Sequence, residues 1–310
     1  MSDVKSLSVK VGSLELKNPI IAASGTFGYG LEYKDYYPPG ELGAVIVKGV
    51  SVEPMTGNET PRICETTAGM LNAIGLQNPG LEAFIRDKVP LFESLGAPVL
   101  INLFGQRVKD FPLLAKRLSE CEGIAGFELN ISCPNVEAGG LEFASDPKAV
   151  RKIVEAVCKV TSFPVWVKLA PYYGIAVDVA RAAEEGGASA LTVANTYPAL
   201  AIDIERKRPL LANITGGLSG PAIKPLTLYH VWKIAERVKI PIVASGGVMG
   251  AEDAVEYLMA GACAVQIGTV HFVNPAAGLE IVSSLRQWLE KSPYSSLAEV
   301  VGLGRVPSNS

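Results

Sequence analysis

The chain has 310 residues, with 28 basic against 31 acidic side chains and a formal net charge of −3 at pH 7. This length suffices for one large α/β barrel or two ordinary domains, and a hydrophobic content of 48% allows a sizeable core. The near balance of charge argues against a nucleic-acid-binding protein, which carries a basic excess. No apolar run approaches the length that spans a bilayer, so we expect no membrane association.

The cysteines give no sign of a disulfide framework or a metal site. They are scattered along the chain, at Cys64, Cys121, Cys133, Cys158 and Cys263. No C-x-x-C pair suggests a bound metal or an iron–sulfur cluster. The first residues, "MSDVKSLSVKVGSLELKNP", lack the apolar stretch of a secretory signal. We therefore expect a reduced, cytoplasmic protein with no metal.

Eight short β-branched runs follow one another along the chain. They cover residues 19–24, 44–48, 98–103, 126–131, 164–169, 190–195, 241–246 and 264–269. Each is a nearly continuous apolar run, which is typical of parallel strands covered on both faces. Helical patterns lie between them at 147–160, 177–188, 228–239 and 251–262, where apolar residues recur at steps of three and four.

This alternation predicts an α/β fold, a (β/α)8 or TIM barrel, formed as a single domain over residues 1–310. Long insertions follow the second strand, at roughly 49–79, and the sixth, at roughly 197–222. Such loops usually carry function or cover a site. A doubly wound sheet is the alternative fold, but it commonly carries a G-x-G-x-x-G fingerprint, which is absent here.

Polar residues and glycines stand at the carboxyl ends of all eight predicted strands. In chain order they are Ser24-Gly25, Lys48-Gly49, Asn102, Asn130 with Cys133, Lys168, Asn195-Thr196, Gly246-Gly247 and Gly268-Thr269. In a barrel these ends open on one face, where active sites are found. Two lysines and three amides on that face suit a ligand with several carbonyl and N–H groups and some negative charge.

The last two strand ends predict a phosphate site. "ASGGV" and "QIGTV" place small residues where backbone N–H groups can surround a phosphate. Lys168 ends an otherwise apolar strand, and two interpretations stay open for it. Its ammonium group either stabilises the negative charge of a reduced flavin or extends to solvent at the rim.

Cys133 lies between a strand end and Pro134, an arrangement that presents its thiol toward the barrel mouth. A thiolate there is a candidate nucleophile or general base. A nucleophile normally needs an activating histidine. The two histidines give no clear partner, because His230 lies in a helical pattern and His271 lies beyond the eighth strand. Proton transfer is therefore the preferred role for Cys133.

Several motifs together resemble the dihydroorotate dehydrogenase family. They are "ASGTFGYG", "VIVKGV", "MLNAIGLQNPG", "NISCPN", "VKLAP", "ANT", "GGLSGPAIKPL", "ASGGV" and "QIGT", in the family's order over nearly the whole chain. The first and third of these are most similar to the NAD-linked class of the cytosolic enzymes. The resemblance implies oxidation of (S)-dihydroorotate to orotate in pyrimidine (UMP) biosynthesis, by a barrel that binds one FMN.

The resemblance also implies roles for individual residues. Cys133 matches the base that removes the C5 proton of dihydroorotate, while the C6 hydride passes to flavin N5. The positions that match FMN-binding residues are Ser24, Lys48, Gly49, Asn102, Asn130, Lys168, Ala194, Gly220, Gly246, Gly247, Gly268 and Thr269. The positions that match orotate-binding residues are Lys48, Asn72, Ala73, Ile74, Gly75, Leu76, Asn130, Asn195 and Thr196.

The NAD-linked class works with an electron-transfer subunit that carries FAD and a [2Fe-2S] cluster, so the resemblance implies a homodimer of this chain within a heterotetramer. Two other functions stay open. One is a flavin oxidoreductase acting on another pyrimidine, and the other is a flavin-loaded binding subunit without turnover. A cysteine-nucleophile transferase is a further alternative, which predicts a covalent adduct on Cys133.

Overall fold

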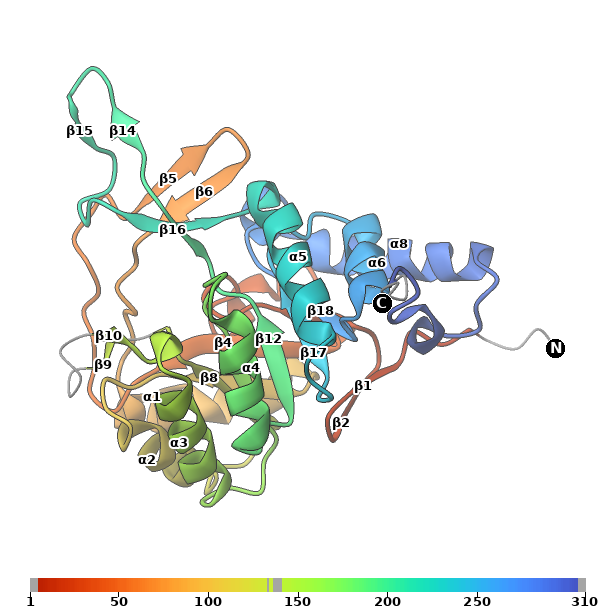
Figure 1. The fold of residues 1–310 in the computed structure, drawn as a ribbon, viewed down its shortest axis with the longest axis horizontal. Helices are drawn as coiled ribbons and strands as arrows, with labels where there is room; N and C mark the ends of the chain where they lie inside the picture. The colour runs from red at the N-terminus through yellow and green to blue at the C-terminus, as the bar shows by residue number, and fades with distance from the viewer. Residues whose placement is uncertain (1–4, 133, 136–140, 306–310) are drawn as a thin grey trace.

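The computed structural model describes residues 5–132, 134–135 and 141–305. Over this part of the chain, eight parallel strands close into a barrel in the order β11-β12-β17-β18-β3-β4-β7-β8 (Figure 1). The strands are β3 (Ile20–Ala22), β4 (Ala44–Val50), β7 (Val99–Leu103), β8 (Gly126–Asn130), β11 (Val165–Lys168), β12 (Ala190–Val193), β17 (Ile242–Ser245) and β18 (Ala264–Ile267). Each falls on one of the predicted runs, so the barrel is confirmed and the doubly wound sheet is excluded.

Helices lie outside the barrel strands. They are α1 (Leu81–Asp87), α2 (Asp110–Leu118), α3 (Pro147–Cys158), α4 (Ala176–Glu185), α5 (Lys224–Ala235), α6 (Ala251–Ala260), α7 (Val270–Val273) and α8 (Ala277–Lys291). Shorter 3-10 turns cover Leu31–Tyr33, Pro39–Glu41, Val89–Leu95, Phe143–Ser145, Pro221–Ile223 and Leu297–Val300. Helix α3 contacts β11, α5 contacts β17 and α6 contacts β18. The strands are thereby covered on their outer faces, as their continuous apolar sequences require.

Helix α3 shows how the local sequence sets an element. Asp146 caps its start, where the side chain accepts a hydrogen bond of 2.9 Å from the Lys148 backbone N–H. Pro147 follows at the first helical position, where its missing N–H costs nothing. The buried face of the helix consists of Val150, Ile153, Val154 and Val157. The predicted helix at 147–160 is therefore confirmed, with its end at Cys158.

A β-hairpin lies at the amino-terminal end of the barrel. It consists of β1 (Val9–Val11) and β2 (Leu14–Leu16), which pair antiparallel. Its turn contains Gly12, with φ of +62°, and a Cβ there would lie 3.0 Å from the Ser189 carbonyl oxygen, just before β12 begins. The hairpin therefore lies against the end of the barrel opposite the predicted site.

The two insertions contain strands, which the sequence analysis did not predict. β5 (Ile63–Thr66) and β6 (Gly69–Asn72) come from the first insertion, and β13 (Tyr197–Ala199) and β16 (Gly216–Ser219) come from the second. They form one antiparallel sheet in the order β13-β16-β6-β5 (Figure 1). The second insertion also forms a hairpin of β14 (Ile202–Asp203) and β15 (Arg208–Pro209), which extends beyond this sheet in Figure 1. A further short pair joins β9 (Pro134–Asn135) to β10 (Leu141–Glu142).

In the described part of the chain, no helix has both the length and the apolar character that crossing a bilayer requires.

Helix α2 offers a matched test of the core. Leu114 is fully buried, whereas its neighbour Leu113 is 47% exposed. We expect Leu114→Ala to lower the free energy of unfolding by about 2–5 kcal/mol, because it leaves a cavity against the barrel. Leu113→Ala should lower it by less than about 1 kcal/mol. Urea unfolding of both variants measures this difference, and equal losses would contradict the assigned helix orientation.

Candidate active site

A large cavity opens at the carboxyl ends of the barrel strands. Its volume is about 1250 Å³, and residues from the strand ends and from both insertions line it. Parallel strands in a closed barrel end on one face, so side chains far apart in sequence meet there. The sheet formed by β5, β6, β13 and β16 contributes the wall farther from the barrel, through residues such as Asn72 and Ser219.

The structure brings the predicted site residues together in this one cavity. Those on its wall are Ser24, Lys48, Gly49, Asn72, Ala73, Ile74, Gly75, Leu76, Asn102, Asn130, Lys168, Ala194, Asn195, Thr196, Gly220, Gly246, Gly247, Gly268 and Thr269. Cys133 lies outside the described residues. The predicted convergence of the strand ends on one rim is therefore confirmed for the described residues, while the binding roles of the individual residues stay predictions.

Asparagine and serine side chains form a small network after β8. The Asn130 side-chain oxygen accepts a 3.1 Å hydrogen bond from the Ser132 backbone N–H. The Asn195 amide donates to the Ser132 hydroxyl at 3.1 Å and to the Asn130 oxygen at 3.5 Å. The Asn195 oxygen in turn accepts from the Thr196 backbone N–H at 2.8 Å. These contacts fix both amides beside Ser132, at the end of β8.

Two cations lie on the wall contributed by β4 and the first insertion. Burial lowers the pKa of Lys48, and the nearby Arg62 guanidinium lowers it further, while Glu32 acts in the opposite direction. Arg62 donates a 2.9 Å hydrogen bond to the Gln77 side chain. Two like charges at a partly buried position favour an anionic ligand, because its charge relieves their repulsion.

The loops after β17 and β18 have free backbone donors. The backbone N–H groups of Gly247, Val248 and Thr269 make no hydrogen bond within the described part of the chain. Gly247 has φ of +71°, a conformation that glycine adopts without strain. Gly25 also lines the cavity, and a Cβ added there would meet no atom within 4 Å, so the space beside it is open. This arrangement of unpaired N–H groups around small residues suits a phosphate.

The floor of the cavity contains a buried cation and an unpaired acceptor. Lys168 is only 7% exposed and has no ion pair among the described residues, so it does not extend to solvent. The Gln266 side-chain oxygen is buried without a hydrogen-bond partner. Together with the free N–H groups above, these features fit the FMN that the sequence resemblance implies, which offers a phosphate and a ring with polar edges.

Sequence reasoning missed some of the cavity residues. Arg62 lies in the first insertion, where nothing in the local pattern distinguishes it. Gln266 had a signal, because it is the polar residue inside the apolar run "AVQI". Glu128 does not line the cavity, but it had the same signal inside "GFELN" and is fully buried in β8. Phe272 and Val273 line the mouth while remaining 55% and 72% exposed.

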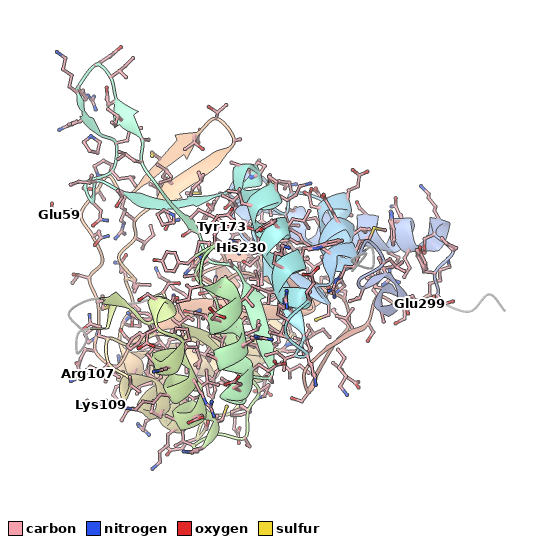
Figure 2. The ribbon with its side chains drawn as sticks, in the orientation of Figure 1. Glu59, Arg107, Lys109, Tyr173, His230 and Glu299 are labelled. Atoms are coloured by element: carbon pink, nitrogen blue, oxygen red, sulfur yellow. The ribbon has the colours of Figure 1, made fainter. Side chains whose placement is uncertain are left out.

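The two histidines lie away from the cavity wall. His230 of α5 is buried, with its ring 4.3 Å from that of Tyr173, and both line a separate hollow of about 320 Å³ (Figure 2). Burial lowers the pKa of His230. His271 is 1% exposed, and its Nε2 lies 3.0 Å from the Tyr37 hydroxyl oxygen. Among the described residues, neither histidine lies on the cavity wall, so neither is placed to activate a catalytic group there.

Known proteins similar to this chain agree with the kind of site that the cavity forms. The family model described as dihydroorotate dehydrogenase matches residues 6–289. The chain belongs to this family. It is 49% identical over 296 residues to the dihydroorotate dehydrogenase B (NAD(+)) catalytic subunit of Trichlorobacter lovleyi, covering 96% of this chain and 97% of that protein. Proteins with the same description from Geobacter metallireducens and Geotalea uraniireducens are 48% and 47% identical over the same shares.

His271 predicts a pH dependence of stability. Burial lowers its pKa from 6.5 to about 4 in the folded chain. Between these values the unfolded chain binds the proton and the folded chain does not, so His271 contributes its full stability above pH 6.5 and loses it as the pH falls toward 4. We expect the wild type to lose about 2 kcal/mol at pH 5 relative to pH 7 through this residue.

The measurement is urea unfolding of the wild type and of His271→Gln at both pH values. Other acid-sensitive groups affect both proteins alike, so the difference between the two proteins isolates His271. A difference that stays constant from pH 7 to pH 5 would contradict the assignment.

Proposed function

We propose that this protein oxidises (S)-dihydroorotate to orotate in pyrimidine biosynthesis, as the FMN-containing catalytic subunit of an NAD-linked enzyme. Membership of the dihydroorotate dehydrogenase family supports the reaction. The relatives, which are described as NAD(+)-linked catalytic subunits, support NAD as the electron acceptor.

One observation carries the proposal. A single cavity combines unpaired backbone N–H groups, a buried cation at Lys168, and a second cationic wall at Lys48 and Arg62. The unpaired N–H groups suit the phosphate of a flavin nucleotide, and Lys168 suits its ring. The wall with Lys48 and Arg62 suits a small anion bound beside the flavin. A binding site for one neutral pyrimidine alone would not need cations on two walls.

FMN would be held by the residues at the strand ends. Gly246, Gly247, Gly268 and Thr269 offer backbone N–H groups to its phosphate, and Lys168 places a positive charge at the ring. The other proposed contacts are Ser24, Lys48, Gly49, Asn102, Asn130, Ala194 and Gly220. When bound, FMN supplies an acceptor at N5 for the hydride that leaves C6 of the substrate.

Dihydroorotate would lie between the strand ends and the segment from Asn72 to Leu76. Its ring has alternating carbonyl and N–H groups, which asparagine reads because its amide both donates and accepts. Asn72, Asn130 and Asn195 supply such amides, with Thr196 beside them. The Lys48 ammonium group offsets the substrate carboxylate. The Asn72 amide is itself held by a 3.3 Å hydrogen bond to the Gly217 carbonyl oxygen, so the covering sheet positions it.

Cys133 would act as the base. Its thiolate accepts the proton from C5, and the electron pair of that C–H bond forms the C5–C6 double bond as the C6 hydride departs. The fixed amides of Asn130 and Asn195 would hold the substrate ring at the end of β8, and Cys133 follows this strand end in the sequence. The neighbouring sequence, "NISCPN", supports this assignment by its match to the family.

A partner subunit would connect this site to NAD. We propose that it carries FAD and a [2Fe-2S] cluster, and that two copies of this chain assemble with two partner subunits in the cytoplasm. The description "catalytic subunit" given to the relatives supports the existence of a partner.

The reaction predicts a spectral change without any partner. Anaerobic dihydroorotate should bleach the visible flavin absorption of the purified chain, and the rate should rise with pH through about 8.5, the ordinary pKa of a thiol. Cys133→Ser should slow bleaching by about 10²- to 10⁴-fold, the typical contribution of a general base. Cys121→Ser, just beyond the end of α2, is the matched control and should react normally. If the bound flavin stays yellow after dihydroorotate is added, the protein is a flavin-loaded binding subunit without turnover.

Lys48 predicts specificity for the carboxylate. Lys48→Ala should weaken orotate binding by about 10- to 150-fold, the range for a lost hydrogen bond to a charged group. Uracil, which lacks the carboxylate, should bind with nearly unchanged affinity. Titration of the flavin absorbance with each ligand measures both constants, and Lys10→Ala at an exposed position of β1 is the control. Equal losses for both ligands would favour an oxidoreductase of another pyrimidine.

A further inference from the structure

A buried carboxylate lies at the centre of a hydrogen-bond network inside the barrel. Glu128 of β8 has no exposed surface. One of its oxygens accepts a 2.8 Å hydrogen bond from the Asn102 amide nitrogen. The other accepts from the Thr192 hydroxyl and from the Gln266 amide nitrogen, each at 2.7 Å. Four different strands therefore meet at one side chain, and two of its partners, Asn102 and Gln266, line the cavity.

This network fixes which end of each amide faces the carboxylate. A carboxylate only accepts hydrogen bonds, so both amides must turn their NH₂ groups toward Glu128. The Gln266 nitrogen also lies 3.1 Å from the Thr192 hydroxyl oxygen, whose own hydrogen is donated to Glu128. A reversed Gln266 would place its carbonyl oxygen against two acceptors. Its orientation is therefore set by charge, not by packing alone.

The carbonyl oxygens must then point elsewhere. The Asn102 oxygen lies beside Gly49 on the cavity wall, 2.7 Å from where a Cβ of that glycine would be. The Gln266 oxygen is buried and has no hydrogen-bond partner. A buried acceptor without a donor is costly, and native proteins nearly always pair such groups with the protein, with water or with a ligand. The unpaired Gln266 oxygen therefore calls for a ligand that donates an N–H group to it.

We propose that Glu128 is a positioning residue, which holds Asn102 and Gln266 so that their carbonyl oxygens face the flavin ring as hydrogen-bond acceptors, for the N3–H group of the oxidised ring and for the further N–H groups of the reduced ring. The inference rests on the proposed function, because it assumes FMN in this cavity. It goes beyond that function in assigning the orientation of both amides to a side chain that does not itself line the cavity. An oxidised isoalloxazine ring has one N–H group, at N3, and its reduced form has more.

Glu128→Gln is the direct test. Glutamine has one acceptor and one donor end, so it cannot accept from both amides in their present orientations. Either Asn102 or Gln266 must reverse, which puts an NH₂ group where a carbonyl oxygen was. We expect FMN to dissociate from the purified holoprotein about tenfold more readily, the factor for one lost neutral hydrogen bond. The rise of flavin fluorescence on serial dilution measures release, and the visible spectrum of the remaining bound flavin reports its changed surroundings.

A charge exchange separates amide orientation from simple loss of structure. In the double variant E128Q/Q266E, the glutamine at position 128 still accepts a hydrogen bond from Asn102 and donates one to the glutamate at position 266. The other oxygen of that glutamate then takes the place of the unpaired Gln266 oxygen, so an acceptor is restored there. We expect this variant to recover most of the lost FMN affinity. Thr192→Val removes one hydrogen bond from Glu128 without forcing a reversal, so it should retain FMN nearly as well as the wild type. Glu122→Gln on an exposed loop controls for the chemical change itself.

Weaker FMN binding in Glu128→Gln, with recovery in the double variant, supports the inference. Equal retention by Glu128→Gln and the wild type overturns it, as does a loss in Thr192→Val as large as in Glu128→Gln. Should Glu128→Gln fail to fold, Gln266→Leu removes the unpaired carbonyl and leaves Glu128 in place, and unchanged FMN retention there overturns the inference. A wild type that holds no FMN overturns the proposed function together with this inference.

Discussion

Closure of the parallel barrel is the constraint on which the remaining structure depends. Eight parallel strands in one closed sheet leave no edge unpaired, and every carboxyl end must open on the same face. Residues as distant as Ser24 and Thr269 therefore line one cavity, although neither is near the other in sequence. The opposite end of the barrel is covered by the β1–β2 hairpin and serves the stability of the fold rather than the site.

The polar floor of the cavity follows from the same closure. Side chains that point into a barrel must fill it, and a polar group placed there is costly unless it is hydrogen-bonded. Glu128 meets this requirement by accepting from Asn102, Thr192 and Gln266. Such a network is rigid because each member limits the orientation of the next. The floor of the site is thus held in place before any ligand binds.

That upper wall comes from two insertions that are separate in sequence. Asn72 of the first insertion pairs with Gly217 of the second across the β6–β16 register. Neither segment alone could bury its backbone groups, because an isolated two-stranded hairpin is marginally stable in water. Their pairing over the barrel mouth places the predicted substrate segment, Asn72 to Leu76, opposite the strand ends. The proposed substrate segment and the covering sheet are therefore one structural unit.

The sequence by itself determined the eight strands, the barrel and the residues at the strand ends, because continuous apolar runs and the polar groups that end them are local signals. The resemblance added proposed chemical roles, including that of Cys133 as a base. Only the tertiary structure decided that the insertions form a common sheet, that Arg62 lies beside Lys48, and that Glu128 orients the amides of Asn102 and Gln266. These are contacts between segments far apart in the chain, and no local pattern of residues records which distant partners will meet once the barrel closes.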